Sequence, residues 1–150
     1  MSATSPSIVK VYRAESDEAF DHIFNIRTTV FVKEESVDDE DEYDGFDHLA
    51  NHYLALLDGQ PVGTARWRIQ PNSGKVRMER FAVLKPYRRR KIGSALMERI
   101  IADIGSNKEI YVHVQPEYQA FFASFGLEIE GETFEEAGML HQKMVLEPKS

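Results

Sequence analysis

Short stretches of alternating apolar and polar residues recur along this chain, and they predict β-strands. The first is residues 8–13, where the side chains of Ile8, Lys10 and Tyr12 would lie on one face of a strand and those of Val9, Val11 and Arg13 on the other. Asp58-Gly59 predicts a tight hairpin between two later strands, and residues 71–74 (Pro-Asn-Ser-Gly) predict another turn. The predicted strands are residues 8–13, 52–57, 62–69, 75–84, 109–114, 127–130 and 140–146. Seven strands of this kind are enough for one sheet.

Helical spacing of apolar residues appears between some of these strands. Ser16 is a candidate N-cap for the first helix, and Gly105 is a candidate C-terminal glycine for the second. The predicted helices are residues 17–33, about 92–104 and 116–126. The fourth and fifth strands flank a crossover helix and should therefore be parallel. The order of elements predicts an α/β fold with a mixed, mostly antiparallel seven-stranded sheet flanked by helices.

Length and charge narrow the class of protein. The chain has 150 residues, a formal net charge of −7 and no cysteine. We expect a single domain over residues 1–150, with residues 1–7 as a flexible tail. The negative charge argues against nucleic acid as a partner, and the absence of cysteine excludes thiolate chemistry. The chain lacks an apolar signal core and an apolar run of about 18 residues, so we expect a cytoplasmic protein without a membrane partner.

The stretch from Glu79 to Leu96 combines three features of a phosphate-binding turn. An apolar run at residues 81–84 predicts the end of a buried strand, and a helix begins near Gly93. Between them lies a basic turn, residues 88–91, with the sequence Arg-Arg-Arg-Lys. The first N–H groups of a helix lack partners within the helix, and the helix dipole favours an anion there. The stretch therefore predicts a phosphate site, with a solvated basic surface as the alternative.

The acidic segment, residues 34–47, contains nine carboxylates and no basic residue. One interpretation is a lip that attracts a cationic substrate to a nearby cleft. The other is a solvated loop without a function of its own. Composition alone leaves both interpretations open.

Several motifs give the chain a family resemblance. The segment VLKPYRRRKIGSAL leads from the fourth strand into its helix and resembles the phosphate loop of the GNAT family of acyl-CoA-dependent N-acetyltransferases, Gln/Arg-x-x-Gly-x-Gly/Ala. Arg88 matches the first position and Gly93 the last glycine, whereas Lys91 replaces the middle glycine. A lysine can offer the same backbone N–H where φ need not be positive. FFASFGL, at residues 121–127, resembles the family's helix-ending Phe-Tyr-x-x-x-Gly-Phe.

Finer similarities point to the ElaA/YjcF-like branch of this family. They are TTVFVKEESV in the first helix, DEYDGFD before His52, and FEEAGMLHQKM near the end of the chain. The resemblance implies the three-layer GNAT fold and acetyl-CoA as co-substrate, with no metal. The residues expected to bind acetyl-CoA are Phe81, Ala82, Val83, Arg88, Arg89, Arg90, Lys91, Ile92, Gly93, Ser94, Gln115 and Phe122. Among them, the N–H of Val83 would stabilise the oxyanion, a donor worth about 3–4 kcal/mol in other enzymes.

The candidate general base is Glu79. It lies two residues before Phe81 and so shares a face of the strand with apolar residues. A carboxylate in such surroundings could have a raised pKa and accept a proton through water. The alternative is an ion pair with an arginine of a neighbouring strand, where Arg66, Arg68 and Arg77 are available.

The candidate general acids are Tyr118 and His141. Many GNAT enzymes have a tyrosine at the position of Phe122, and phenylalanine has no proton to donate. Tyr118 lies four residues earlier, on the same helix face. His141 begins the last strand and could act as an acid, a base or a substrate contact. A third alternative is that the thiolate leaves without an acid.

The candidate acceptor contacts lie mainly in and beside the acidic segment. They are Arg27, Glu35, Asp44, Asp47 and His52. His48 and His52 are four residues apart, but a strand beginning at His52 would separate them, so no metal site is expected. His113, in the fifth strand, is interpreted as a core histidine.

Together these features predict an N-acetyltransferase that transfers acetyl from acetyl-CoA to a primary amine of a small molecule or peptide by direct attack. The absence of cysteine excludes an acyl-cysteine intermediate. The alternatives are a GNAT-like module that senses acyl-CoA without turnover and a binder of RNA or another anion. Homodimerisation is possible.

Overall fold

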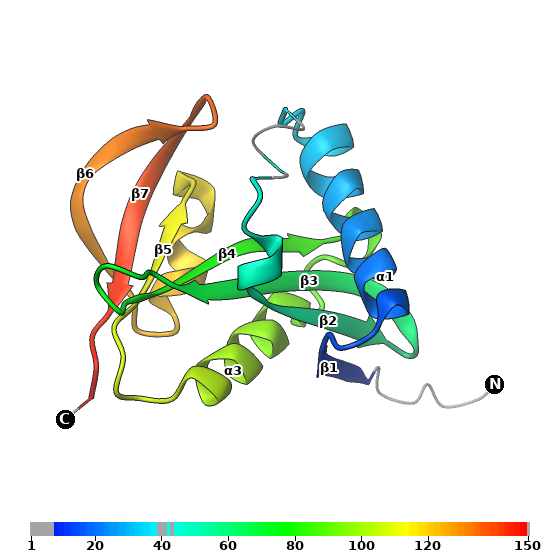
Figure 1. Ribbon diagram of the computed structural model, residues 1–150. Helices are drawn as coiled ribbons and strands as arrows, with labels where there is room; N and C mark the ends of the chain where they lie inside the picture. The colour runs from blue at the N-terminus through cyan, green and yellow to red at the C-terminus, as the bar shows by residue number, and fades with distance from the viewer. Residues whose placement is uncertain (1–7, 39–41, 43, 150) are drawn as a thin grey trace.

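The computed structural model describes residues 8–38, 42 and 44–149; the predicted tail at residues 1–7 lies outside them. The strands form one sheet in the order β1-β2-β3-β4-β5-β7-β6 (Figure 1). Their bounds are β1 Val9–Arg13, β2 Asn51–Leu57, β3 Gln60–Ile69, β4 Val76–Val83, β5 Ile110–Val114, β6 Glu128–Glu136 and β7 Met139–Leu146. β4 and β5 are parallel, and the other neighbouring strands are antiparallel. The predicted mixed seven-stranded sheet is confirmed.

Helices cover both faces of the sheet (Figure 1). The helical bounds are α1 Asp17–Arg27, η1 Thr28–Glu34, η2 Asp47–Leu49, η3 Lys85–Tyr87, α3 Ile92–Ile104, η4 Pro116–Tyr118 and α4 Gln119–Ala123. β2 explains the layers, because its side chains alternate between faces: Tyr53 packs in the core with α3, whereas Leu54 packs in the core with α1. The expected three-layer fold is confirmed.

Three predicted elements change. The helix predicted at residues 116–126 is a 3₁₀ turn, η4, followed by α4, which ends at Ala123. The first helix is α-helical only to Arg27 and continues as a π-helix, η1, to Glu34; its predicted N-cap is confirmed, since the Ser16 hydroxyl accepts a hydrogen bond from the Ala19 N–H at 3.1 Å. The predicted connection at residues 132–138 was wrong. β6 runs to Glu136 and reverses at Ala137-Gly138, where both residues have positive φ. Its charged residues mislead because β6 is an edge strand with solvent-exposed positions.

Gly63 sets the distance between the sheet and the start of α3. A Cβ atom at this position would lie 2.8 Å from Cγ2 of Ile92 and 3.3 Å from the carbonyl oxygen of Ala82. Any larger residue at this position would therefore push the helix away from the sheet. Through Gly63, β3 fixes the position of the helix N-terminus next to the end of β4.

Candidate active site

A cleft of about 660 Å³ opens where β4 and β5 diverge. The two strands pair through Val76–Ile110 and Arg77–Tyr111, and beyond these pairs residues of both strands line the cavity. The other walls are the N-terminus of α3, the β5–η4 connection, the end of η1, and the β6–β7 hairpin. The candidate residues that line it are Glu35, Glu79, Phe81, Ala82, Val83, Arg88, Arg89, Lys91, Ile92, Gly93, Ser94, Gln115, Tyr118, Phe122 and His141.

β4 turns part of its backbone toward this cleft. A bulge falls between Glu79, which pairs with Arg66, and Ala82, which pairs with Thr64, and Arg80 within it has a φ of 58°. The Leu84 N–H donates to the Val62 carbonyl of β3 at 2.9 Å. Because N–H groups alternate in direction along a strand, the N–H of Val83 points away from β3, toward the cleft.

The turn between β4 and α3 adopts the conformation that glycine usually provides. Lys91 has φ 62° and ψ 22°, in the left-handed region, and α3 begins at the next residue. Arg89 is also left-handed, with a φ of 65°. The condition under which a lysine would replace the motif glycine freely, a φ that need not be positive, is therefore not met. The turn keeps its shape and carries a strain of about 1–2 kcal/mol at a non-glycine residue.

Charge in the basic turn is only partly neutralised. The Arg88 guanidinium binds the Glu34 carboxylate at 2.6 and 2.9 Å, and its Nε donates to the Val83 carbonyl at 2.8 Å. Arg88 therefore braces the turn against η1 and β4. Arg89 and Lys91 are exposed and line the cleft, whereas Arg90 is exposed but lies outside the lining. None of these three forms an ion pair with the residues that the structure describes.

Glu79 has arginines on every side. It is 8% exposed and lies 2.7 Å from Arg66 Nε, with Arg68 Nε and Arg77 Nε each at 2.9 Å. Burial alone would raise the pKa of its carboxyl, but the arginines outweigh burial and lower the pKa. The predicted raised pKa was wrong, and the alternative ion pairing is what the structure contains. A carboxylate held in this way is a weak proton acceptor.

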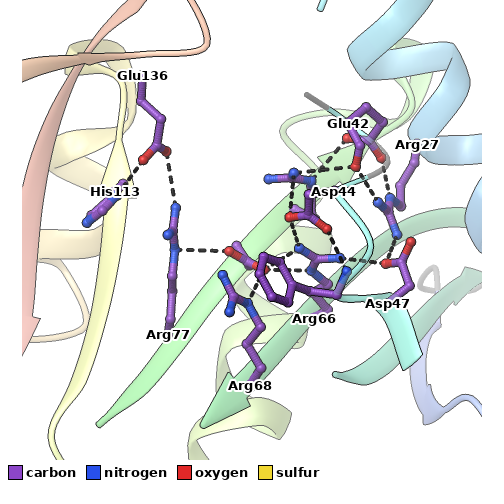
Figure 2. Close-up of polar contacts among 12 residues, drawn as sticks. Arg27, Glu42, Asp44, Asp47, Arg66, Arg68, Arg77, His113 and Glu136 are labelled. Carbon is purple, nitrogen blue, oxygen red and sulfur yellow. Dashed lines mark hydrogen bonds and ion pairs between the residues drawn. The ribbon is translucent and has the colours of Figure 1, made fainter. Parts of the chain in front are cut away.

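Three carboxylates of the acidic segment, Glu42, Asp44 and Asp47, pack onto buried or nearly buried arginines (Figure 2). Asp47 accepts hydrogen bonds from Arg27 at 2.6 Å and from Arg66 at 2.5 Å. Asp44 lies 2.7 Å from Arg66 Nη2 and 3.2 Å from Arg80 Nη2. Burial opposes ionisation of both aspartates, but their arginine partners lower both pKa values. The expected open acidic lip was wrong for this pair, whose charges are compensated.

Arg27, Asp44, Asp47 and His52 lie outside the cleft lining. Arg27 is 1% exposed and binds Glu42. His52 is buried, and its Nε2 lies 2.9 Å from the Asp47 carbonyl. These contacts are structural, and they place the four residues beneath the cleft wall.

Glu35 differs from its neighbours in the acidic segment. It lines the cleft and has no salt bridge among the residues that the structure describes; burial, then the nearby Glu34, raises the pKa of its carboxyl. Tyr118 lies close by at the edge of the cleft, and burial followed by the charge of Glu35 raises its pKa. Phe122 is buried and packs edge-on against Phe81, with ring centroids 5.4 Å apart.

His113 and Glu136 were missed as site residues. Both line the cleft, and His113 Nδ1 lies 2.9 Å from Glu136 Oε2. His141 instead contacts the Met139 carbonyl through Nδ1 at 2.8 Å. Only the period of the strand could have pointed to His113: it shares a face with Tyr111, which pairs in parallel with Arg77.

The comparisons with known proteins agree with this geometry. Residues 12–148 match the acetyltransferase (GNAT) domain family, so the chain belongs to the GNAT acetyltransferases and is an acyl-CoA-dependent acyltransferase. It falls in the ElaA/YjcF-like branch: it is 32% identical to the N-acetyltransferase YjcF of Bacillus subtilis (strain 168), over 91% of this chain and 99% of that one.

Solved structures share the fold. Escherichia coli ElaA superimposes with a TM-score of 0.82 at 25% identity, covering 93% of this chain and all of that one. A GNAT acetyltransferase from Elizabethkingia anophelis, solved with acetyl-CoA bound, gives a TM-score of 0.69 at 13% identity, covering 93% and 97%.

Among residues 8–38, 42 and 44–149, no helix is long and apolar enough to cross a membrane. The same residues contain no group of three or more histidine and carboxylate side chains arranged to hold a metal ion.

Proposed function

We propose that this protein transfers the acetyl group of acetyl-CoA to a primary amine by direct attack of the amine on the thioester. The observation that carries the proposal is the cleft between β4 and β5, which combines an open strand edge with the N-terminus of α3. The acetyl-CoA bound to the similarly folded E. anophelis enzyme supports the choice of donor.

In this proposal the cofactor lies along β4 and ends at the basic turn. The pantetheine arm pairs with the edge formed by Phe81, Ala82 and Val83, and the thioester oxygen accepts the Val83 N–H. The pyrophosphate is bound by the first N–H groups of α3, together with the charges of Arg89 and Lys91. Phe122, packed on Phe81, forms the apolar floor.

The acceptor amine enters the cleft from the side opposite the cofactor. Glu35 is suited to bind the ammonium group, because it lines the cleft without a cationic partner among the described residues. Tyr118 is the candidate donor of a proton to the leaving thiolate. Since the chain has no cysteine, the acyl group passes from sulfur to nitrogen without a thioester on the protein.

Calorimetric titration with acetyl-CoA and with free CoA tests the donor site. Thiol release with n-butylamine, spermidine and Nα-acetyl-lysine amide as acceptors then tests transfer. We expect binding of both forms of the cofactor, and thiol release that depends on the amine. Binding without release by any amine would favour the alternative, a module that senses acyl-CoA. Absence of binding would contradict both.

A further inference from the structure

Two histidines that line the cleft lie on either side of Phe134. The ring of His113 meets the Phe134 ring edge-on, with centroids 4.8 Å apart. The ring of His141 stacks on it at 6.1 Å and an interplanar angle of 23°. Both imidazoles line the cleft, so either could reach an amine bound there.

The partners of the two rings differ. His113 Nδ1 lies 2.9 Å from Glu136 Oε2, and the other oxygen of Glu136 accepts a hydrogen bond from Arg77 Nη2 at 3.1 Å (Figure 2). His141 Nδ1 faces the backbone carbonyl of Met139 at 2.8 Å. A carboxylate and a carbonyl are both acceptors, so in the neutral form of each ring the proton lies on Nδ1 and the lone pair on Nε2.

Glu136 is ionised wherever the enzyme works. The hydrogen bond from His113, together with Arg77 and despite burial, lowers the pKa of its carboxyl to about 2. A carboxylate at Nδ1 stabilises the imidazolium that forms when Nε2 takes a proton, whereas a backbone carbonyl brings no charge. His113 Nε2 has no hydrogen bond to any residue within the described part of the chain.

We propose that His113 is the general base of the transfer and that Glu136, held by Arg77, is its positioning residue. The inference rests on the proposed function. His113 Nε2 accepts a proton from the acceptor ammonium, directly or through one water, and the freed nitrogen pair forms the C–N bond. The C–S bond breaks, and the thiolate takes a proton from Tyr118, which regains the second proton lost by nitrogen. The products are the acetamide, CoA thiol and one proton returned to water from His113.

The charges around His113 fit this role better than those around Glu79. Glu79 contacts three arginines, which hold its proton affinity down. His113 faces Glu136 from β6, Arg77 from β4, and Lys143 and His141 from β7, with Tyr111 on its own strand. Lys143 is itself drawn away, since its ammonium lies 3.1 Å from Glu130 and over the Tyr111 ring.

The test compares His113→Gln with His22→Gln, a matched change on α1 outside the cleft. With acetyl-CoA and the best of the three amines, we expect His113→Gln to lower kcat about 10²- to 10³-fold, while calorimetry gives an unchanged acetyl-CoA affinity. His22→Gln should behave as wild type. In His113→Ala, added imidazole should restore part of the rate, which a purely structural role would not allow. A kcat within about threefold of wild type in His113→Gln would overturn the proposal.

Glu136 provides a second test that spares the histidine. Glu136→Gln should lower kcat about tenfold with little change in KM for the amine, and Glu136→Asp should recover part of this loss. Equal losses in the two variants, or a loss confined to KM, would overturn the positioning role. A wild-type protein that binds acetyl-CoA but acetylates none of the amines would overturn the proposed function, and the assignment of His113 with it. When the wild type acetylates an amine, a loss of transfer confined to the His113 variants bears only on the assignment of the general base.

Discussion

The basic turn, residues 88–91, and the acidic segment, residues 34–47, are both runs of like charge, but they differ in how many of their charges form ion pairs in the folded protein. In the acidic segment, Glu42, Asp44 and Asp47 pack onto Arg27, Arg66 and Arg80. In the basic turn, only Arg88 forms an ion pair among the described residues, with Glu34. Three positive charges stay exposed beside the cleft or next to it.

The difference shows that a run of charge indicates a binding site only when the fold leaves it without partners. The arginines that meet Glu42, Asp44 and Asp47 come from α1, β3 and β4, and they are buried or nearly so. A buried arginine without a carboxylate partner would lower the stability of the fold by several kcal/mol. Glu42, Asp44 and Asp47 therefore stabilise the fold by compensating the charges of these arginines. Arg89, Arg90 and Lys91 of the basic turn compensate no buried charge among the described residues, so they are available to a ligand.

The largest expected effect is loss of stability in acid. The folded pKa values of Asp44, Asp47 and Glu79 lie below the ordinary 3.8, 3.8 and 4.5. Their stabilisation is therefore complete above those values and is lost as pH falls through the folded ones. We expect the free energy of unfolding in urea to fall steeply below about pH 4.

Two groups work against this trend. Burial raises the pKa values of Glu35 and Glu42, so these two alone would make the folded state more favourable in acid, and the net loss is smaller than the sum for Asp44, Asp47 and Glu79. A stability that rises as the pH drops from 4 to 3 would contradict the compensated network.

Asp47→Asn breaks the network at one position. It leaves Arg27 and Arg66 with less negative charge in a mostly buried setting, and we expect a loss of about 2–4 kcal/mol in urea unfolding. Asp38→Asn is the matched control, because Asp38 is exposed in the same acidic segment; it should change stability by less than about 0.5 kcal/mol. A large rise in KM for spermidine at unchanged stability would instead restore the acidic-lip interpretation.

The basic turn should respond in binding rather than in stability. Arg89→Ala with Lys91→Ala removes two charges that line the cleft, and we expect acetyl-CoA to bind about tenfold more weakly, or roughly 1.4 kcal/mol. The defect should shrink at high salt, because exposed charges are screened. Arg90→Ala is the control outside the lining and should have a smaller effect. An equal loss in Arg90→Ala would mean that net charge, not position, binds the pyrophosphate.

Sequence patterns predicted the features that are decided by residues close together in the chain. Strand alternation and helical spacing gave the order of elements, and the crossover at residues 92–104 gave the parallel pair. The strand, basic turn and helix start are contiguous, so the candidate phosphate site was visible as well. Each of these features is decided within a few residues, where local rules apply.

The polar contacts of the site depend on register between distant segments and could not be predicted. Glu79 meets Arg66 across β3 and β4, and Asp47 meets Arg66 from 19 residues away. Glu136 joins His113 and Arg77 only because β6 extends to the hairpin that the sequence analysis had placed in a connection. The wrong end of β6 and the omission of His113 have the same cause, because both depend on pairing between strands that are far apart in the sequence.

The smallest expected effect isolates the backbone of the basic turn from its charge. Lys91→Gly and Lys91→Ala remove the same ammonium group, but only glycine relieves the left-handed φ of 62°. Relief of about 1–2 kcal/mol, less the added entropy of glycine in the unfolded chain, should leave Lys91→Gly more stable than Lys91→Ala by about 0.5–1 kcal/mol in urea unfolding. The two variants should bind acetyl-CoA alike if the turn already has its binding shape with lysine. A glycine variant that binds more tightly would mean that lysine holds the turn away from that shape, and that the replaced motif glycine matters for the cofactor and not only for the fold.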